Sequence, residues 1–586
     1  MKYFVGAVNF HEKNVASELV RRYIRESGLQ HGIVRGDEFF SSVSPRLNGP
    51  ASQIDAHLIL HCEPFIKVSF SLQAQKSLGF RLSEDASIEG SLVTLYRKHY
   101  QNWPAMLCSE HVTAVWDPIN KRLLMSRDRF GTKSLYYSFV GKTFVFSNRL
   151  ACVFAFPGVS QELSTDAALD FLLFGKHNNF ESELTPFRAI KAVLPGHVLL
   201  KSTTDCRVIR YWNFPTSTPV HHHQTSKDTL DKFSSLLHKA VSRRVGSGKL
   251  LVALSGGVDS TTTAAVALNV DNSFRGRTAA FTVADSDQNE EHIYAAKVAK
   301  KLGLPHERFD DSDYSLFECK TPCLIPTENP FPQKYVDLQF FTSSRADTVL
   351  TAGAADNLIV WSDVYLAREF RVAGLFHAIR SAFYYKKMFG KRIPWRSSRA
   401  RSKGVPTYAL PDWVRQNSGC AGTVIDRWDE FWGRMPGQAH VRHPQVHSAM
   451  ICVNWDRDLG LVDFEVDSGN RMDPFFDEDL IDFVLSLPAL PWFYKKRLMK
   501  GVGFRYLPPE VLQRKKSPAK DLVAGALQLA DLESLNRVSG DEFLNDLVDY
   551  TKWQPVYPHM APSARYVNMR LIAFSRWLMG FRGFMK

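Results

Sequence analysis

One short stretch constrains this chain more than any other, because an apolar run, a glycine turn and a second apolar run follow one another there. Residues 249–254 (KLLVAL) have the length of a buried strand, residues 255–257 (SGG) break it, and residues 260–268 (STTTAAVAL) continue at helical length. Such a turn presents backbone N–H groups to an anion at the helix N-terminus. We therefore expect a site for the phosphates of a nucleotide.

The loop differs from the G-x-x-x-x-G-K-[ST] phosphate loop, because no lysine follows its second glycine and Asp259 takes that place. Residues 255–260 (SGGVDS) resemble instead the SGGxDS pyrophosphate loop of asparagine synthetases, β-lactam synthetases and lasso-peptide cyclases, which split ATP between its α and β phosphates. An ordinary strand, turn and helix of a doubly wound sheet is the alternative. The resemblance implies that the ATP site includes Leu254, Ser255, Gly256, Gly257, Asp259 and Ser260.

Length and composition limit what can surround this loop. A chain of 586 residues is too long for one core and should form at least two domains. It has no apolar run of the roughly 18 residues that a membrane span needs, and its N-terminus becomes charged too early for a secretory signal. Eight scattered cysteines favour reduced thiols, and we expect a cytoplasmic protein.

Residues 1–215 are expected to form a sheet-based domain, because short alternating runs are separated by turn-rich segments. The expected strands are residues 3–9, 65–72, 111–116, 123–126, 134–140 and 142–147. Three segments, 128–137 (DRFGTKSLYY), 144–148 (FVFSN) and 190–197 (IKAVLPGH), resemble blocks of class II glutamine amidotransferase domains in the same order. The resemblance implies an Ntn-type α/β sandwich.

The start of the chain departs from that family. Active glutaminases of this class use an N-terminal cysteine whose amine and thiol act together on glutamine. Here Met1 is followed by Lys2. We therefore expect a degenerate glutaminase domain with a structural or recognition role, and ammonia from glutamine is disfavoured as a co-substrate.

After an expected linker at residues 216–227, residues 228–586 alternate helix and strand, which predicts a doubly wound parallel sheet. The expected strands are residues 249–254, 278–283, 306–309 and 348–351. Ligands of such sheets lie at the carboxyl ends of the strands. We expect the adenine edge to meet Phe281, Thr282 and Val283 there, as the family resemblance to PP-loop synthetases also implies.

A second acidic loop follows the last of these strands. Residues 351–357 (TAGAADN) resemble the SGxGSDE block of the same families, which implies that Gly353 lines the ATP site. Asp356 would join Asp259 in holding Mg²⁺, a cation that takes oxygen ligands and usually one or two carboxylates plus phosphates. Ala354, where asparagine synthetases carry glutamate and β-lactam synthetases tyrosine, and Asn357 argue against those two enzymes in their usual form. The general base is left unassigned.

The segment at about residues 362–450 is an expected insert with a basic first half. Between residues 361 and 403 two acidic residues stand against eleven basic ones: Arg368, Arg371, Arg380, Lys386, Lys387, Lys391, Arg392, Arg396, Arg399, Arg401 and Lys403. A solvated helical face is one interpretation, and a docking surface for a peptide or a protein is the other. Residues 408–414 (YALPDWV) contain a Leu-Pro-x-Trp element similar to one in lasso-peptide cyclases.

The C-terminal region resembles the asparagine synthetase pattern again. Residues 471–477 (RMDPFFD) match one block, Lys496 and Lys500 stand in its K-x-x-L-R segment, and residues 507–516 (LPPEVLQRKK) match a third. The comparison places Lys516 as the catalytic lysine that reaches the active site. Its ammonium would stabilise charge on the acyl-adenylate and the tetrahedral intermediate.

Together these patterns favour an AMP-forming amide synthetase that uses ATP and Mg²⁺. The favoured hypothesis is a lasso-peptide macrolactam synthetase that joins an Asp or Glu side chain of a core peptide to the peptide's own N-terminus. A leader-binding protein and a leader protease would be its partners, with no nucleic acid and no transmembrane segment. The alternatives are a β-lactam synthetase-like enzyme, an ammonia-dependent asparagine synthetase and a non-catalytic peptide-binding protein.

Overall fold

The computed structural model covers the whole chain and describes the residues of the following ranges. They are 3–9, 32–35, 38–43, 52–54, 57–62, 88–107, 110–117, 119–175, 182–219, 225–246, 248–270, 272–284, 290–310, 313–314, 317, 330, 334–359, 374–390, 411–415, 419–438, 440–443, 446, 450, 470–514, 527, 531–538 and 540–585. Met1, Lys2, the expected strand at 65–72 and Lys516 lie outside them.

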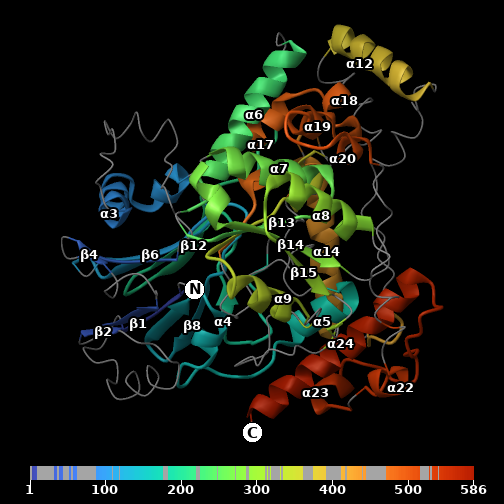
Figure 1. The fold of residues 1–586 in the computed structure, drawn as a ribbon. Helices are drawn as coiled ribbons and strands as arrows, with labels where there is room; N and C mark the ends of the chain where they lie inside the picture. The colour runs from blue at the N-terminus through green and yellow to red at the C-terminus, as the bar shows by residue number, and fades with distance from the viewer. Residues whose placement is uncertain are drawn as a thin grey trace.

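The N-terminal domain is built from two six-stranded antiparallel sheets (Figure 1). One has the order β10-β8-β9-β1-β3-β2 and contains β1 (Tyr3–Asn9), β2 (Gly32–Arg35), β3 (Glu38–Val43), β8 (Tyr136–Val140), β9 (Thr143–Ser147) and β10 (Lys191–Ala192). The other has the order β12-β11-β7-β6-β5-β4 and contains β4 (Ser52–Ile54), β5 (His57–Cys62), β6 (Val112–Asp117), β7 (Arg122–Arg127), β11 (His197–Lys201) and β12 (Cys206–Arg210). Side chains from both sheets share one core, so the sheets form a sandwich.

Helices cover both outer faces of this sandwich. On one side, α3 (Ile88–His99) and the 3-10 helix η1 (Tyr100–Met106) share a core with Val115 of β6 and Leu124 of β7. On the other, α4 (Leu150–Phe154) and α5 (Thr165–Phe174) share a core with Val145 of β9. The four layers confirm the expected glutaminase-like α/β sandwich.

Coverage on both faces explains why the strand sequences are so apolar. Every residue of β6 (VTAVWD) is buried, because Ala114 and Trp116 face the other sheet while Val115 faces α3. Gly6 of β1 lies opposite Phe146 of β9, and a Cβ at Gly6 would lie 2.3 Å from the Phe146 ring. A glycine is therefore required for this strand pair to close over the ring.

The second domain holds a five-stranded parallel sheet with the order β15-β14-β13-β16-β17. Its strands are β13 (Leu250–Ala253), β14 (Thr278–Ala284), β15 (His306–Asp310), β16 (Thr348–Leu350) and β17 (Asn470–Met472). Numbered along the chain, the order is 3-2-1-4-5, and it reverses between β13 and β16. That reversal point is where open α/β sheets bind ligands. The doubly wound sheet confirms the prediction, although β17 was not expected.

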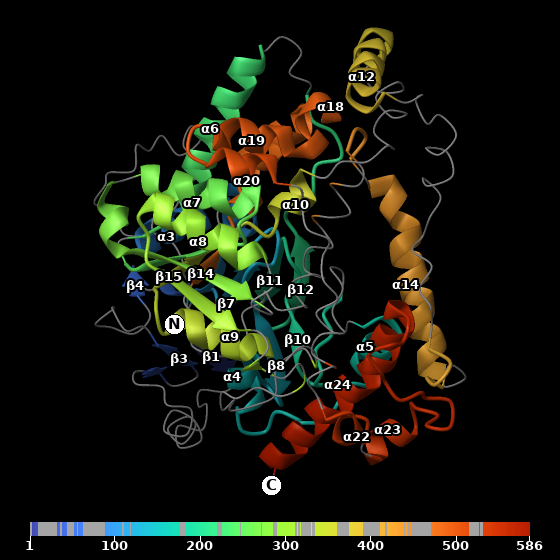
Figure 2. The ribbon, with the colours of Figure 1, turned by 45° about the vertical axis from the view of Figure 1, so that its right-hand side comes forward.

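Helices surround this sheet and extend from it (Figure 2). The described ones are α6 (Ser226–Ser242), α7 (Val258–Val270), η2 (Asn272–Arg277), α8 (Glu290–Leu302), α9 (Lys334–Ser343), α10 (Ala355–Leu358), α12 (Gly374–Phe389), α14 (Gly419–Gln438), η5 (Pro474–Phe476), α17 (Glu478–Ser486), α18 (Ala489–Trp492), η6 (Tyr494–Lys496), α19 (Arg497–Gly503), α20 (Pro509–Gln513), α22 (Leu532–Leu535), α23 (Glu542–Asn545) and α24 (Pro562–Met585). Thr225 starts α6 with a reciprocal cap through Asp228. None of the helices described has the length and apolar character needed to cross a membrane.

The last helix packs on the first domain rather than on the synthetase sheet. Phe574 of α24 lies against Phe171 of α5, and Trp428 of α14 stacks on Phe174 of α5. Figures 1 and 2 both show α24 beside α5, with the C-terminus near the sandwich. The two domains therefore share a helical core, and the domain boundaries expected from the sequence stay a prediction.

Candidate active site

The expected phosphate loop lies where β13 ends and α7 begins. The backbone N–H of Leu254 donates to the carbonyl of Phe281 at 2.8 Å, which ties the loop to the end of β14. Gly256 has φ +66°, and a Cβ there would lie 2.6 Å from Cβ of Tyr294 and 2.8 Å from the Glu291 carbonyl oxygen of α8. Both the backbone conformation and the close approach of α8 therefore require glycine.

Hydroxyl groups fix the shape of this loop. The Ser255 and Ser260 hydroxyls lie 3.1 Å apart, and the Ser255 N–H donates to the Ser260 hydroxyl at 3.2 Å. The Gly257 N–H donates to the Ser255 hydroxyl at 3.3 Å. The loop is thereby held open at the N-terminus of a 13-residue helix, where the helix dipole favours a phosphate.

The end of β14 lies beside the phosphate loop, and its contact with the adenine edge stays a prediction. Thr282 is buried, and its hydroxyl donates to the Leu254 carbonyl at 2.7 Å and lies 2.8 Å from Nε2 of His306. The neighbouring Val283 side chain is exposed. Burial, and then the charge of His292, lower the pKa of His306, which keeps its ring neutral. His306 is a contributor that sequence reasoning did not identify.

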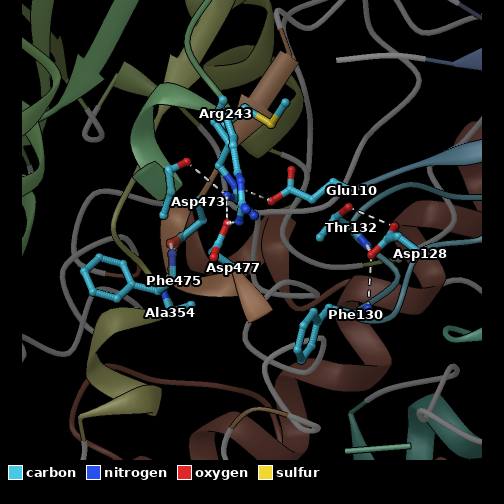
Figure 3. A network of polar contacts seen from close by, with 12 residues as sticks. Glu110, Asp128, Phe130, Thr132, Arg243, Ala354, Asp473, Phe475 and Asp477 are labelled. Atoms are coloured by element: carbon cyan, nitrogen blue, oxygen red, sulfur yellow. Dashed lines mark hydrogen bonds and ion pairs between the residues drawn. The ribbon is translucent and has the colours of Figure 1, made fainter. Parts of the chain in front are cut away.

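The loop that carries Asp356 is held by a residue from a distant part of the chain. The Ala354 N–H donates to the Asp473 carboxylate at 2.9 Å, and the Phe475 N–H donates to the other oxygen of that carboxylate at 3.0 Å (Figure 3). The Thr351 N–H donates to the Met472 carbonyl at 2.8 Å. Asp473, which lies in the RMDPFFD block, therefore positions the Asp356 loop.

Lys496 joins the two acidic loops. Its ammonium group contacts the Asp259 carboxylate and lies 2.5 Å from that of Asp356. Burial opposes the charge, but the two carboxylates outweigh it and raise the pKa of Lys496. Lys495 and Lys496 both have positive φ, at 49° and 56°, a costly conformation for residues with a side chain. The strained backbone of Lys495 and Lys496 thus places the Lys496 ammonium group beside the phosphate loop.

The two carboxylates fit the Mg²⁺ that the sequence predicted. Because Asp259 and Asp356 reach the same ammonium group, they converge closely enough to share one cation. Mg²⁺ is commonly held by one or two carboxylates together with substrate phosphates. Within the described ranges, no group of three or more His, Cys, Asp or Glu side chains could hold a metal. The pair therefore suits a cation that arrives with a nucleotide.

Comparison with protein families agrees with this geometry. The family model described as asparagine synthase matches residues 232–577, which include both acidic loops and Lys496. The chain belongs to the asparagine synthase family. A second model, described as a glutamine amidotransferase domain, matches residues 70–212. The chain is therefore an asparagine synthetase-like enzyme of the ligase type, with a glutamine amidotransferase-like first domain.

The individual proteins to which this chain is similar are distant from it in sequence. "Asparagine synthetase [glutamine-hydrolyzing] 3" of Bacillus subtilis (strain 168) is 27% identical over 458 residues, which are 70% of this chain and 68% of that protein. "Amidase chyE" of Penicillium rubens is 25% identical over 263 residues, 42% of this chain and 38% of that protein. A solved structure titled "structure of the allosteric regulatory enzyme of purine biosynthesis" has a TM-score of 0.24 at 10% identity, and covers 55% of this chain and 77% of its own.

The catalytic lysine expected from the family blocks was Lys516, which lies outside the described residues. That assignment stays a prediction. Lys496 lies between Asp259 and Asp356, and the K-x-x-L-R pattern was the available signal for it. Arg514 also reaches the site. Its guanidinium donates to the Gly256 carbonyl at 3.4 Å and lies 4.5 Å from the centre of the Tyr294 ring. Arg514 therefore approaches the phosphate loop of this asparagine synthase-family chain.

The first domain's DRFG block has a structural role. The Asp128 carboxylate accepts hydrogen bonds from the Phe130, Thr132 and Lys133 N–H groups and from the Thr132 hydroxyl, at 2.8–3.1 Å (Figure 3). The turn presents Phe130 to the second domain, where its ring lies 5.1 Å from that of Phe476. This family block therefore builds the domain interface.

A buried ionic network completes that interface. Arg244, two residues after the end of α6, donates to Glu110 of the first domain at 3.1 Å and to Asp477 at 3.2 Å, and all three side chains are buried. Arg243 donates to Asp477 at 2.7 Å and to Asp479 at 3.0 Å. The end of α6 thus fixes the first domain to the segment that begins with Asp473.

Proposed function

We propose that this chain activates a carboxylate with ATP and joins it to an amine, releasing pyrophosphate and then AMP. The observation that carries the proposal is the contact of one ammonium group, Lys496, with both Asp259 and Asp356 beside the phosphate loop. Membership of the asparagine synthase family supports an ATP-using, amide-forming enzyme. The site lies at the point where the strand order reverses, which suits a nucleotide.

The first step forms an acyl-adenylate. A carboxylate oxygen attacks the α-phosphorus, the bond to the bridging oxygen of the β-phosphate breaks, and pyrophosphate leaves. The N-terminus of α7 and the Ser255 and Ser260 hydroxyls would bind the departing phosphates. The end of β14, from Phe281 to Val283, would receive the adenine edge. Mg²⁺, held by Asp259 and Asp356, would neutralise phosphate charge.

The second step forms the amide. The amine nitrogen attacks the acyl carbon, a proton leaves the nitrogen, and AMP departs with the bonding electrons. Negative charge develops on the acyl oxygen, and the Lys496 ammonium is placed to stabilise it. Lys500 lies one helical turn after Lys496. Burial, then Lys495 and Lys496, lower the pKa of Lys500, which makes it a candidate acceptor of the amine proton for the kinetic test given below.

The favoured substrate is a ribosomally made peptide whose Asp or Glu side chain is joined to its own N-terminus, as in lasso-peptide cyclases. In this proposal the amine comes from the peptide itself and not from glutamine. We include in the proposal a cytoplasmic location and a leader-binding protein and leader protease as partners. A β-lactam synthetase-like enzyme, an ammonia-dependent asparagine synthetase and a non-catalytic peptide-binding protein remain the alternatives.

The test is to incubate the protein with ATP, Mg²⁺ and candidate substrates while following nucleotides and product mass. AMP formation with loss of one water from a peptide supports the macrolactam synthetase. AMP formation with free aspartate and ammonia favours the asparagine synthetase alternative. Production of ADP in place of AMP contradicts the adenylation step.

A further inference from the structure

Helix α12 presents large apolar side chains to solvent. Leu375, Phe376, Ile379 and Phe383 have exposed fractions of 70%, 76%, 58% and 65%. Its opposite side is buried through Ser381 and Tyr385, and the helix packs against α18. Figures 1 and 2 both show α12 at the outer end of the molecule, beyond α18 and far from the sandwich. The exposed side chains therefore belong to a helix that the rest of the chain supports from one side.

The exposed residues form a single stripe. At 3.6 residues per turn, these four positions fall within an arc of about 100°. Arg380 and Lys387 border the stripe, Lys386 lies at its C-terminal end, and both lysines are exposed. The helix sequence GLFHAIRSAFYYKKMF contains no acidic residue. An apolar face with basic residues along its border characterises helices that lie in the interface of an anionic membrane.

We propose that α12 docks this protein on membranes that contain anionic phospholipids. Leu375, Ile379 and Phe383 would enter the acyl-chain boundary, while Arg380, Lys386 and Lys387 would meet the phosphate headgroups. The charge of the helix complements such a surface, and residues 361–403 carry eleven basic residues against two acidic ones. A protein partner would need an acidic apolar groove, whereas an anionic bilayer supplies both properties over the whole length of the helix.

This surface is separate from the phosphate loop and does not depend on the proposed function. The connection between them is short, because α12 packs on α18 and α18 leads directly into η6, which ends at Lys496. A docked molecule would therefore hold its nucleotide site close to the bilayer. Membrane binding and AMP formation can be measured independently.

The experiment uses the full-length protein and flotation with two kinds of vesicle. One kind is pure phosphatidylcholine, and the other also contains phosphatidylglycerol. The protein should float with the anionic vesicles, and we expect raised salt and pure phosphatidylcholine each to reduce binding by about tenfold or more. The variant Ile379→Glu/Phe383→Glu should lose binding by a similar factor, because it places two charges in the acyl-chain boundary.

A matched control is Ile119→Glu, which changes an equally exposed apolar residue in the turn between β6 and β7 and should leave binding unchanged. Failure of the unaltered protein to float with anionic vesicles would overturn the proposal. So would unchanged flotation of the double variant. If sedimentation instead shows a dimer that the double variant abolishes, the stripe is an interface between two copies and the membrane proposal is wrong.

Discussion

Aspartates of family blocks have different surroundings in the two domains. Asp128 in the sandwich accepts four hydrogen bonds from its own turn. Asp259 and Asp356 of the synthetase domain, which come from two different loops, converge on one lysine ammonium group. The sequence blocks that contain these aspartates resemble family blocks equally well in both domains. The difference shows that a sequence block that resembles the family can serve to build an interface. The convergence of side chains from separate loops is what identifies a reactive site.

The sharpest test of this comparison neutralises one charged side chain in each domain. Lys496→Met should lower the rate of AMP formation by about a thousandfold or more, because it removes the cation that faces the developing charge. Asp128→Asn should leave the rate per folded molecule almost unchanged and lower the melting temperature instead. Steady-state kinetics and thermal unfolding of both variants measure this. Equal losses of activity would contradict the separation of roles.

Removing the buried arginine of the interface should mainly affect stability. Arg244→Met leaves Glu110 and Asp477 without this partner, and breaking a buried pair in this way costs about 3–5 kcal/mol. The control is Arg505→Met, which removes an exposed pair with Asp231 and should cost about 1 kcal/mol or less. Denaturant unfolding measures both. If the two variants unfold alike, the network does not hold the domains together.

The contact between α5 and α14 should respond to pH. Asp170 is fully buried and contacts Arg427 and Trp428, and burial raises its pKa to about 7. A raised carboxyl pKa means that the folded state binds the proton more tightly than the unfolded state. Stability should therefore fall as pH rises from about 4 to about 7. Asp170→Asn should reduce that fall. The melting temperature should therefore change less between pH 5 and pH 8 in the variant than in the unaltered protein.

The last prediction concerns Lys500 as the candidate proton acceptor. As the proton acceptor it acts in its neutral form, so the rate should rise with pH through its lowered pKa. Lys500→Arg keeps the size and charge but cannot lose a proton in this range. We expect the variant to bind ATP normally and to lose the rising limb of the profile of kcat against pH. An unchanged profile would exclude Lys500 as the base.

Much of the synthetase site could be predicted, because its parts are local. The run KLLVAL, the SGG turn and the following helix have bounds close to β13 and α7. Asp356 could be placed because it follows a strand at the same edge of the sheet. The structure shows that Asp259 and Asp356 converge on one ammonium group, whereas their role as Mg²⁺ ligands stays a prediction.

The parts that could not be predicted depend on distant contacts. Lys496 reaches the site because two successive residues adopt positive φ, which nothing in the sequence YKKRLMK indicates. Asp473 positions the Asp356 loop through a strand of three residues, too short to recognise from pattern. The catalytic role given to Lys516 rests on sequence order alone and stays a prediction. In the first domain, no local pattern showed that the DRFG turn faces the other domain.

The packing of α24 on α5 also has a consequence for how the protein is made. Helix α5 leaves the ribosome hundreds of residues before α24, the helix that packs on it. At about 5–20 residues per second, the apolar face of α5 remains uncovered for tens of seconds during translation. Truncation before α24 should therefore leave the apolar face of α5 uncovered and give an aggregation-prone fragment.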